Sequence, residues 1–72
     1  MKYCWEELAN AIVMMAVKDY RLARWRVRRF PGATKSQDRM RECERFFRSG
    51  WFRVLTEING EELIKQLRSE AA

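Results

Sequence analysis

The longest uninterrupted segment of the sequence, residues 4–29, contains neither glycine nor proline. Residues with high helix propensity dominate this segment, so it predicts one long α-helix. At 1.5 Å per residue such a helix would run about 39 Å. A compact domain of this size has a radius of gyration of about 11 Å. The helix is therefore long for a single small domain.

An apolar stripe runs along this helix when successive residues are placed about 100° apart. The stripe contains Leu8, Ile12, Met15, Leu22 and Phe30, with Trp5 and Ala23 beside it. This pattern predicts that the stripe is the core face of the helix. Asp19 and Arg26 fall on the same stripe, which indicates either that its far half leaves the core or that these two charges meet a partner chain.

The segment "AIVMMAV" at residues 11–17 is apolar on every face, because Val13, Met14 and Val17 lie on sides that the stripe does not cover. A helix that is apolar all round is normally enclosed on all sides. Two short companion helices can hardly enclose it, whereas a second copy of the chain could. We therefore expect a homodimer or a higher homo-oligomer.

The rest of the chain predicts shorter helices. Pro31 and Gly32 favour a turn over 30–34, and apolar spacing predicts a second helix over about 35–48. A short helix over about 50–57 and a last helix over about 60–69 follow. The expected fold class is all-α, with one domain that covers the whole chain.

Ser49 and Asn59 are expected to cap the last two of these helices, and Thr34 with Gln37 fits a capping box that could open the second helix. The segment "WFRVLTEI" after Ser49 could also form a strand, because it is rich in aromatic and β-branched residues, but no other strand is predicted that could pair with it. As a helix it would bury Trp51 or Phe52 together with Leu55. Cys4 and Cys43, the two cysteines, are expected to be buried core thiols.

Charge is concentrated in the stretch "RLARWRVRRF" at residues 21–30, which holds five arginines. Arg21, Arg24 and Arg28 form a basic stripe opposite the apolar one, and Tyr20 and Trp25 flank it. Arginine forks bind phosphate oxygens, and aromatic rings stack on bases. These five residues are the predicted ligand-binding set for a nucleotide-like anion. The same charges also suit the solvent-exposed face of an amphipathic helix.

Catalysis has little support in the sequence. The chain has no histidine and only two cysteines, and it has no glycine-rich phosphate loop, so we expect no enzyme activity, no metal and no cofactor. The seven apolar residues of "AIVMMAV" fall far short of the roughly 20 that a membrane-spanning helix needs. Free thiols without a signal segment favour the cytoplasm.

Two segments, "WEELANAIVMMAVKDYRLA" and "ERFFRSGWFRVLTEINGEELIKQL", cover well over half of the chain. Their pattern resembles a family of small proteins carried by phages and other mobile elements of Gram-positive bacteria. The resemblance implies an accessory protein that acts by binding, in the host cell cytoplasm, and it carries over no site residues. Proteins of this class include helical oligomers that capture the nucleotide signals of host defence.

Three functions remain open at this point. The first is sequestration of a phosphorylated nucleotide signal, which would counteract host defence. The second is inhibition of a host defence complex by protein–protein contact, of the anti-CRISPR type. The third is nucleic-acid binding, which the net charge of +5 supports weakly, since the acidic residues of the second helix oppose a broad basic surface.

Overall fold

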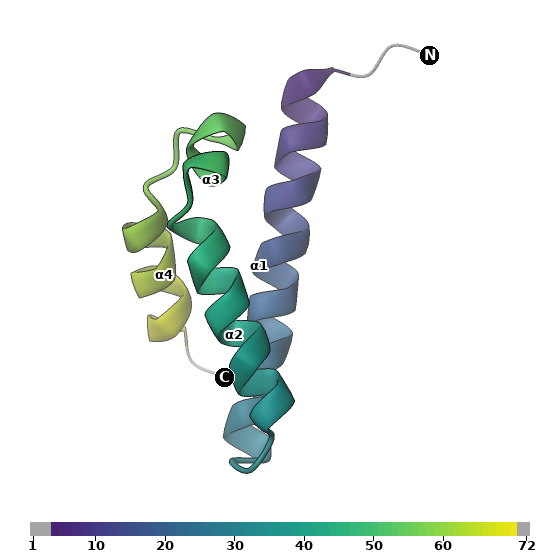
Figure 1. Cartoon of the computed structure of the whole chain (residues 1–72), viewed down its shortest axis with the longest axis vertical. Helices are drawn as coiled ribbons and strands as arrows, with labels where there is room; N and C mark the ends of the chain where they lie inside the picture. The colour runs from purple at the N-terminus through teal and green to yellow at the C-terminus, as the bar shows by residue number, and fades with distance from the viewer. Residues whose placement is uncertain (1–3, 71–72) are drawn as a thin grey trace.

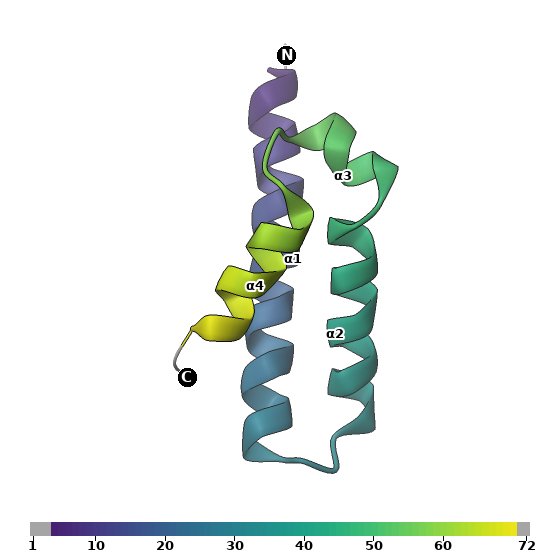
Figure 2. The same cartoon turned by 90° about the vertical axis from the view of Figure 1, so that its left-hand side faces the viewer.

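The computed structural model describes residues 4–70, and helices joined by short turns make up this part of the chain. The long helix α1, Trp5–Arg29, is followed by α2, Thr34–Phe47, which returns antiparallel beside it (Figure 1). The short helix α3, Gly50–Leu55, leads into α4, Gly60–Ser69, which crosses α1 (Figure 2). The all-α class is confirmed, and residues 4–70 contain no strand.

The shape of the chain follows from the long first helix. The radius of gyration is 13.2 Å and the longest dimension is 43 Å, whereas a compact domain of this size would have a radius of about 11 Å. None of the described helices combines the length and the hydropathy that a bilayer-spanning helix requires.

Local signals set the ends of the helices. The Ser49 hydroxyl accepts a hydrogen bond from the Phe52 N–H at 3.2 Å, and the Asn59 side chain accepts from the N–H groups of Glu61 and Glu62 at 2.9 and 3.3 Å. These two predicted caps are confirmed, since each satisfies N–H groups that have no partner inside the helix. The predicted cap at Thr34 is wrong, because Thr34 is the first residue of α2 and the N-cap is Ala33, whose side chain forms no capping hydrogen bond. Helix α3 ends at Leu55, two residues earlier than expected.

The core forms where α1, α2, α3 and α4 meet. Aromatic rings fill its centre: Tyr20 and Phe47 have centroids 6.0 Å apart, and Phe47 and Phe52 have centroids 5.6 Å apart, both in edge-to-face geometry. Phe52 is buried with Leu55, whereas Trp51 is exposed. The prediction that either Trp51 or Phe52 is buried with Leu55 is therefore confirmed, and Phe52 is the buried residue.

The core face of α1 differs from the predicted stripe. The buried face consists mainly of small residues, namely Ala9, Val13, Val17, Tyr20 and Ala23. By contrast, Leu8, Met15, Leu22 and Phe30 are exposed, Met15 by 65%. The prediction that their stripe is the core face of this chain is wrong, because the bulky rings of α2 and α3 need small side chains opposite them to pack closely.

The burial pattern bears on two further expectations. Met14 is 50% exposed, so α2, α3 and α4 of the same chain do not enclose the "AIVMMAV" segment on all sides, as expected for short companion helices. Cys4 is exposed at the start of α1, whereas Cys43 is buried as expected. Burial raises the pKa of the Cys43 thiol, which keeps it protonated and unreactive.

Candidate functional site

Tyr20, the first predicted ligand residue, lies inside the molecule. It is fully buried, and its hydroxyl donates to a carboxylate oxygen of Glu44 at 2.7 Å. Arg68 of α4 donates to the other oxygen of Glu44 at 2.8 Å. Tyr20 therefore joins α1 to α2 and, through Glu44, to α4.

Arg21 and Arg24 hold the end of α4 against α1. Arg21 binds Glu70 with two hydrogen bonds, of 3.0 and 2.7 Å, and these hold the pKa of the Glu70 carboxyl below its ordinary value. Arg24 donates to the main-chain carbonyls of Leu67, Arg68 and Glu70. These contacts satisfy carbonyl groups that have no partner at the end of a helix.

Trp25 and Arg28 are exposed, like Arg21, but they form no hydrogen bond or ion pair with α4 within the described residues. The Arg29 guanidinium lies 5.7 Å from the centroid of the Trp25 ring, within cation–π range. The five predicted residues thus separate into three that dock α4 or the core and two that face solvent. They do not converge on one site.

A groove between α1 and the start of α2 brings together basic side chains from both helices. We call it the basic groove, and it has a volume of about 320 Å³. The following residues line it: Asp19, Leu22, Ala23 and Arg26 from α1, and Lys35, Ser36 and Arg39 from α2. It lies near the turn between α1 and α2, at the lower end of the molecule in Figure 1.

The charges of the basic groove are not balanced. Arg26, Lys35 and Arg39 form no ion pair with any residue of the part of the chain that the structure describes. Asp19 is the one carboxylate in its lining. The first turn of α2 carries no acidic residue, so the partial positive charge of this helix end is also uncompensated there. The groove therefore carries an excess of positive charge.

Sequence reasoning missed this groove because its residues come from two helices. Lys35 and Arg39 are four residues apart and so share one face of α2, a signal that the mixed charges of that helix conceal. Arg26 falls on the apolar stripe of the first helix, so the sequence gives no reason to group it with Lys35 and Arg39. Only the antiparallel hairpin of α1 and α2 places the three basic residues around one groove.

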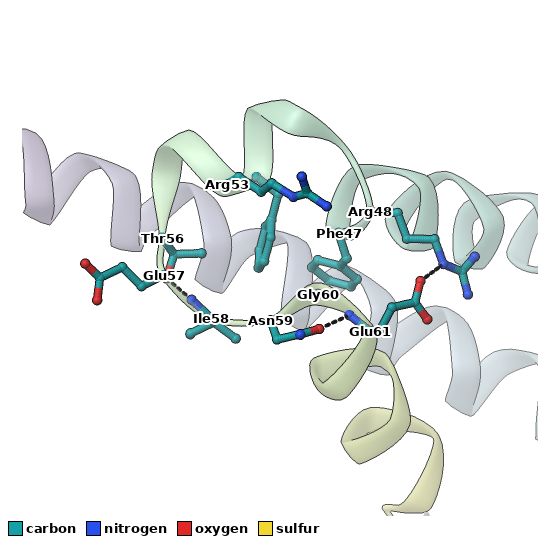
Figure 3. A pocket seen from close by; sticks show the side chains of 10 residues that line it. Phe47, Arg48, Arg53, Thr56, Glu57, Ile58, Asn59, Gly60 and Glu61 are labelled. Atoms are coloured by element: carbon teal, nitrogen blue, oxygen red, sulfur yellow. Dashed lines mark hydrogen bonds and ion pairs between the residues drawn. The ribbon is translucent and has the colours of Figure 1, made fainter.

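A second groove lies between the end of α2, α3 and the turn before α4 (Figure 3). Its volume is about 480 Å³, and Phe47 and Phe52 are among its lining residues. Its polar groups are largely engaged: Arg48 donates to Glu61 at 2.6 Å, and Asn59 caps α4. Two basic and two acidic residues line it, so it favours neither sign of charge. We call it the neutral groove.

Gly60, at the start of α4, lines the neutral groove and packs against the end of α2. A Cβ atom at this position would overlap the main-chain carbonyl of Phe47, so the start of α4 can approach the end of α2 only with glycine here. The close packing of α4 against α2 therefore accounts for the neutral groove without a ligand.

A third groove, at the opposite end of α1 from the basic groove, is acidic. Its lining includes Trp5, Glu6, Leu55 and Glu57, and its volume is about 410 Å³. The molecule thus has a basic end at the α1–α2 turn and an acidic groove at the start of α1.

Comparisons with protein-family models, with curated proteins and with solved structures found no match to this chain. Among residues 4–70, no three His, Cys, Asp or Glu side chains come together in the manner of metal ligands. A proposal for the function therefore has to rest on the geometry of the residues of this chain.

Proposed function

We propose that this chain is a non-catalytic helical homo-oligomer that captures a phosphorylated, nucleotide-like anion in the basic groove. The observation that carries the proposal is the convergence of Arg26, Lys35 and Arg39, none of them in an ion pair among residues 4–70, around a groove with a single carboxylate.

The chemistry of the groove suits phosphate. Two guanidinium groups can each present two N–H donors to phosphate oxygens, and an ammonium adds a compact charge. Ser36 adds a hydroxyl donor, and Leu22 offers an apolar wall. The volume of about 320 Å³ lies at the lower end of the range of roughly 300–1,000 Å³ typical of small-molecule sites. A small phosphorylated ligand fits better than a folded polymer.

The proposal changes the roles of the residues first predicted for the site. Arg21 and Arg24 position α4, so the phosphate contacts fall to Arg26, Lys35 and Arg39 instead. Trp25 and Arg28 remain accessible on the same half of α1. With the resemblance to small phage proteins, we further propose that the captured anion is a nucleotide signal of host defence, bound in the host cytoplasm.

The test is native mass spectrometry and titration calorimetry with AMP, ATP and a cyclic dinucleotide as probes. The Arg39→Gln variant should lose about 1.5–3 kcal/mol of binding free energy for a tightly bound probe, because a charged hydrogen-bond donor is removed. This loss of binding free energy corresponds to a roughly 10- to 150-fold rise in the Kd of the variant for the probe.

The matched control is Arg41→Gln, on the same helix but outside the groove. Arg41 is exposed and paired with Asp38 at 3.4 Å, so its loss should leave the affinity nearly unchanged. Equal losses in the two variants, or no binding of any probe by the unaltered chain, would refute the proposal.

A protein partner is the second candidate, and one observation favours it. Trp51 and Val54 are exposed by 53% and 59%, and their spacing of three residues places them on one face of α3. Exposed tryptophan is a frequent anchor in protein interfaces. Capture of a host protein that Trp51→Ala abolishes and Arg39→Gln does not would favour this function over anion binding.

A further inference from the structure

We infer that the exposed apolar face of α1 binds a second copy of this chain in antiparallel orientation. We call this surface the heptad face, and it consists of Trp5, Leu8, Ile12, Met15 and Leu22. The inference rests on the homo-oligomer of the proposed function, and it adds the surface, the direction and the register of the pairing.

The spacing of the heptad face matches that of helix pairs. Its residues follow one another at intervals of 3, 4, 3 and 7 positions, which are a and d positions of a heptad repeat, and Asp19 occupies the a position that the last interval passes over. Such a repeat keeps one stripe in contact with a partner helix along its whole length. The core face of α1 lies on another side, so both surfaces can be buried at once.

The exposure of these residues shows that α2, α3 and α4 leave the face uncovered. Trp5, Leu8, Met15 and Leu22 are each exposed by 47% or more, and Ile12 is half-buried. An apolar stripe of this length costs free energy in water, at about 25 cal/mol per Å² of apolar surface. A second α1 helix supplies a stripe of the same length and spacing.

Charge decides the direction of the pairing. The first half of α1, residues 5–17, carries two acidic residues and no basic one, whereas residues 18–29 carry six basic residues and one acidic residue. Parallel helices would place two halves of net charge 6 − 1 = +5 side by side, and would set Asp19 against Asp19 and Arg26 against Arg26. Antiparallel helices place the acidic first turn of each copy near the basic half of the other.

The register follows from where the apolar positions end. Beyond Leu22 the next a and d positions are Arg26 and Arg29, so the most apolar antiparallel contact has its centre between Ile12 and Met15. In this register residues 23–29 of each copy project past the contact. The two basic grooves then lie near opposite ends of the dimer, with Arg26, Lys35 and Arg39 outside the contact and with Leu22, a wall of each groove, inside it.

The surface is tested with two neighbouring methionines that point in different directions. Met15 lies on the heptad face, whereas Met14, also exposed, lies about 100° away around the helix. Sedimentation equilibrium should show a dimer for the unaltered chain and for Met14→Glu. Met15→Glu should raise the dimer Kd at least tenfold.

Both variants change exposed residues, and circular dichroism should show unchanged helix content. A monomeric unaltered chain at submillimolar concentration, or equal weakening in the two variants, would overturn the inference. Anion binding by such a monomer would leave the ligand part of the proposed function intact. Conversely, an Arg39→Gln chain that still dimerises but binds no anion would show that dimerisation and anion binding are separate properties.

The direction is tested with a spin label on Cys4, which is exposed at the start of α1, in a Cys43→Ala background. In the antiparallel register the two labels lie about 19 residues apart along the helices, or roughly 30 Å at 1.5 Å per residue. Parallel helices would bring the labels to within about 20 Å of each other, one helix diameter plus the label arms. A measured separation in the shorter range would overturn the antiparallel pairing.

Discussion

One face of helix α1 is buried in the core, whereas another face of the same helix is exposed. The inward face carries Ala9, Val13 and Val17 and is buried, whereas the outward face carries the larger Leu8 and Met15 and is exposed. Hydrophobicity alone would assign the larger residues to the core. The structure shows that the shape of the opposing surface decides instead.

The reason is complementarity of side-chain size. Phe47 of α2 and Phe52 of α3 project bulky rings toward α1, and both rings are fully buried. Small side chains on α1 let these rings approach the helix closely, at the density typical of protein interiors. A face of leucine and methionine would hold the helices further apart. The larger side chains of α1 are instead left exposed.

The largest expected effect comes from truncating the inward face. Tyr20→Ala should lower the free energy of unfolding by about 3–5 kcal/mol, because it leaves a cavity among the aromatic rings and removes a partner of Glu44. Leu22→Ala, two residues away on the outward face, should change it by about 0.5 kcal/mol or less in the monomer. Urea denaturation at a concentration below the dimer Kd measures both. Similar costs for the two variants would contradict the division of the helix into two faces.

A smaller effect on the free energy of unfolding should distinguish Arg24 from Arg28, which the sequence places on one basic stripe. Arg24→Ala should cost about 1–3 kcal/mol, since three carbonyl groups at the end of α4 lose their donor. Arg28→Ala removes an exposed side chain without such contacts and should cost about 0.5 kcal/mol or less. Thermal unfolding and amide exchange in α4 report the difference. If α4 exchanges at the same rate in both variants, Arg24 does not hold it in place.

The smallest expected effect is the pH dependence of the Tyr20–Glu44–Arg68 contact. Burial raises the pKa of Glu44, but the hydrogen bonds from Tyr20 and Arg68 outweigh burial and hold it below the ordinary value of 4.5. Glu44 therefore contributes stability above its pKa in the unfolded chain, and this contribution is lost as the pH falls through the lower folded-state value. Denaturation between pH 7 and pH 3 should show that loss, and Glu44→Gln should reduce it.

At alkaline pH the same contact loses its contribution to stability as the pH rises, not as it falls. Burial, and then the bond to Glu44, raise the pKa of Tyr20 above 10.0. Its contribution is present below pH 10 and is lost as the pH rises through the folded-state pKa. Tyr20→Phe should remove this alkaline loss. A variant that keeps the whole alkaline slope would show that another group causes it.

Much of the fold could be predicted from the sequence, and little of the candidate site. The long helix, the turn at Pro31, and the Ser49 and Asn59 caps depend on residues within a few positions of each other. The basic groove depends on Arg26 and Arg39, which only the hairpin brings together. The predicted set failed to converge because Tyr20, Arg21 and Arg24 meet groups of α2 and α4 that are distant in the sequence.

The sequence by itself determined, to within about two residues, where the helices begin and end, and that the basic charge is concentrated in the second half of the first helix. Both are local properties, set by propensity, capping and composition. The tertiary structure decided which face of α1 is buried and which arginines remain free. Those outcomes depend on the size and polarity of the groups that pack against each position, and these groups come from other helices.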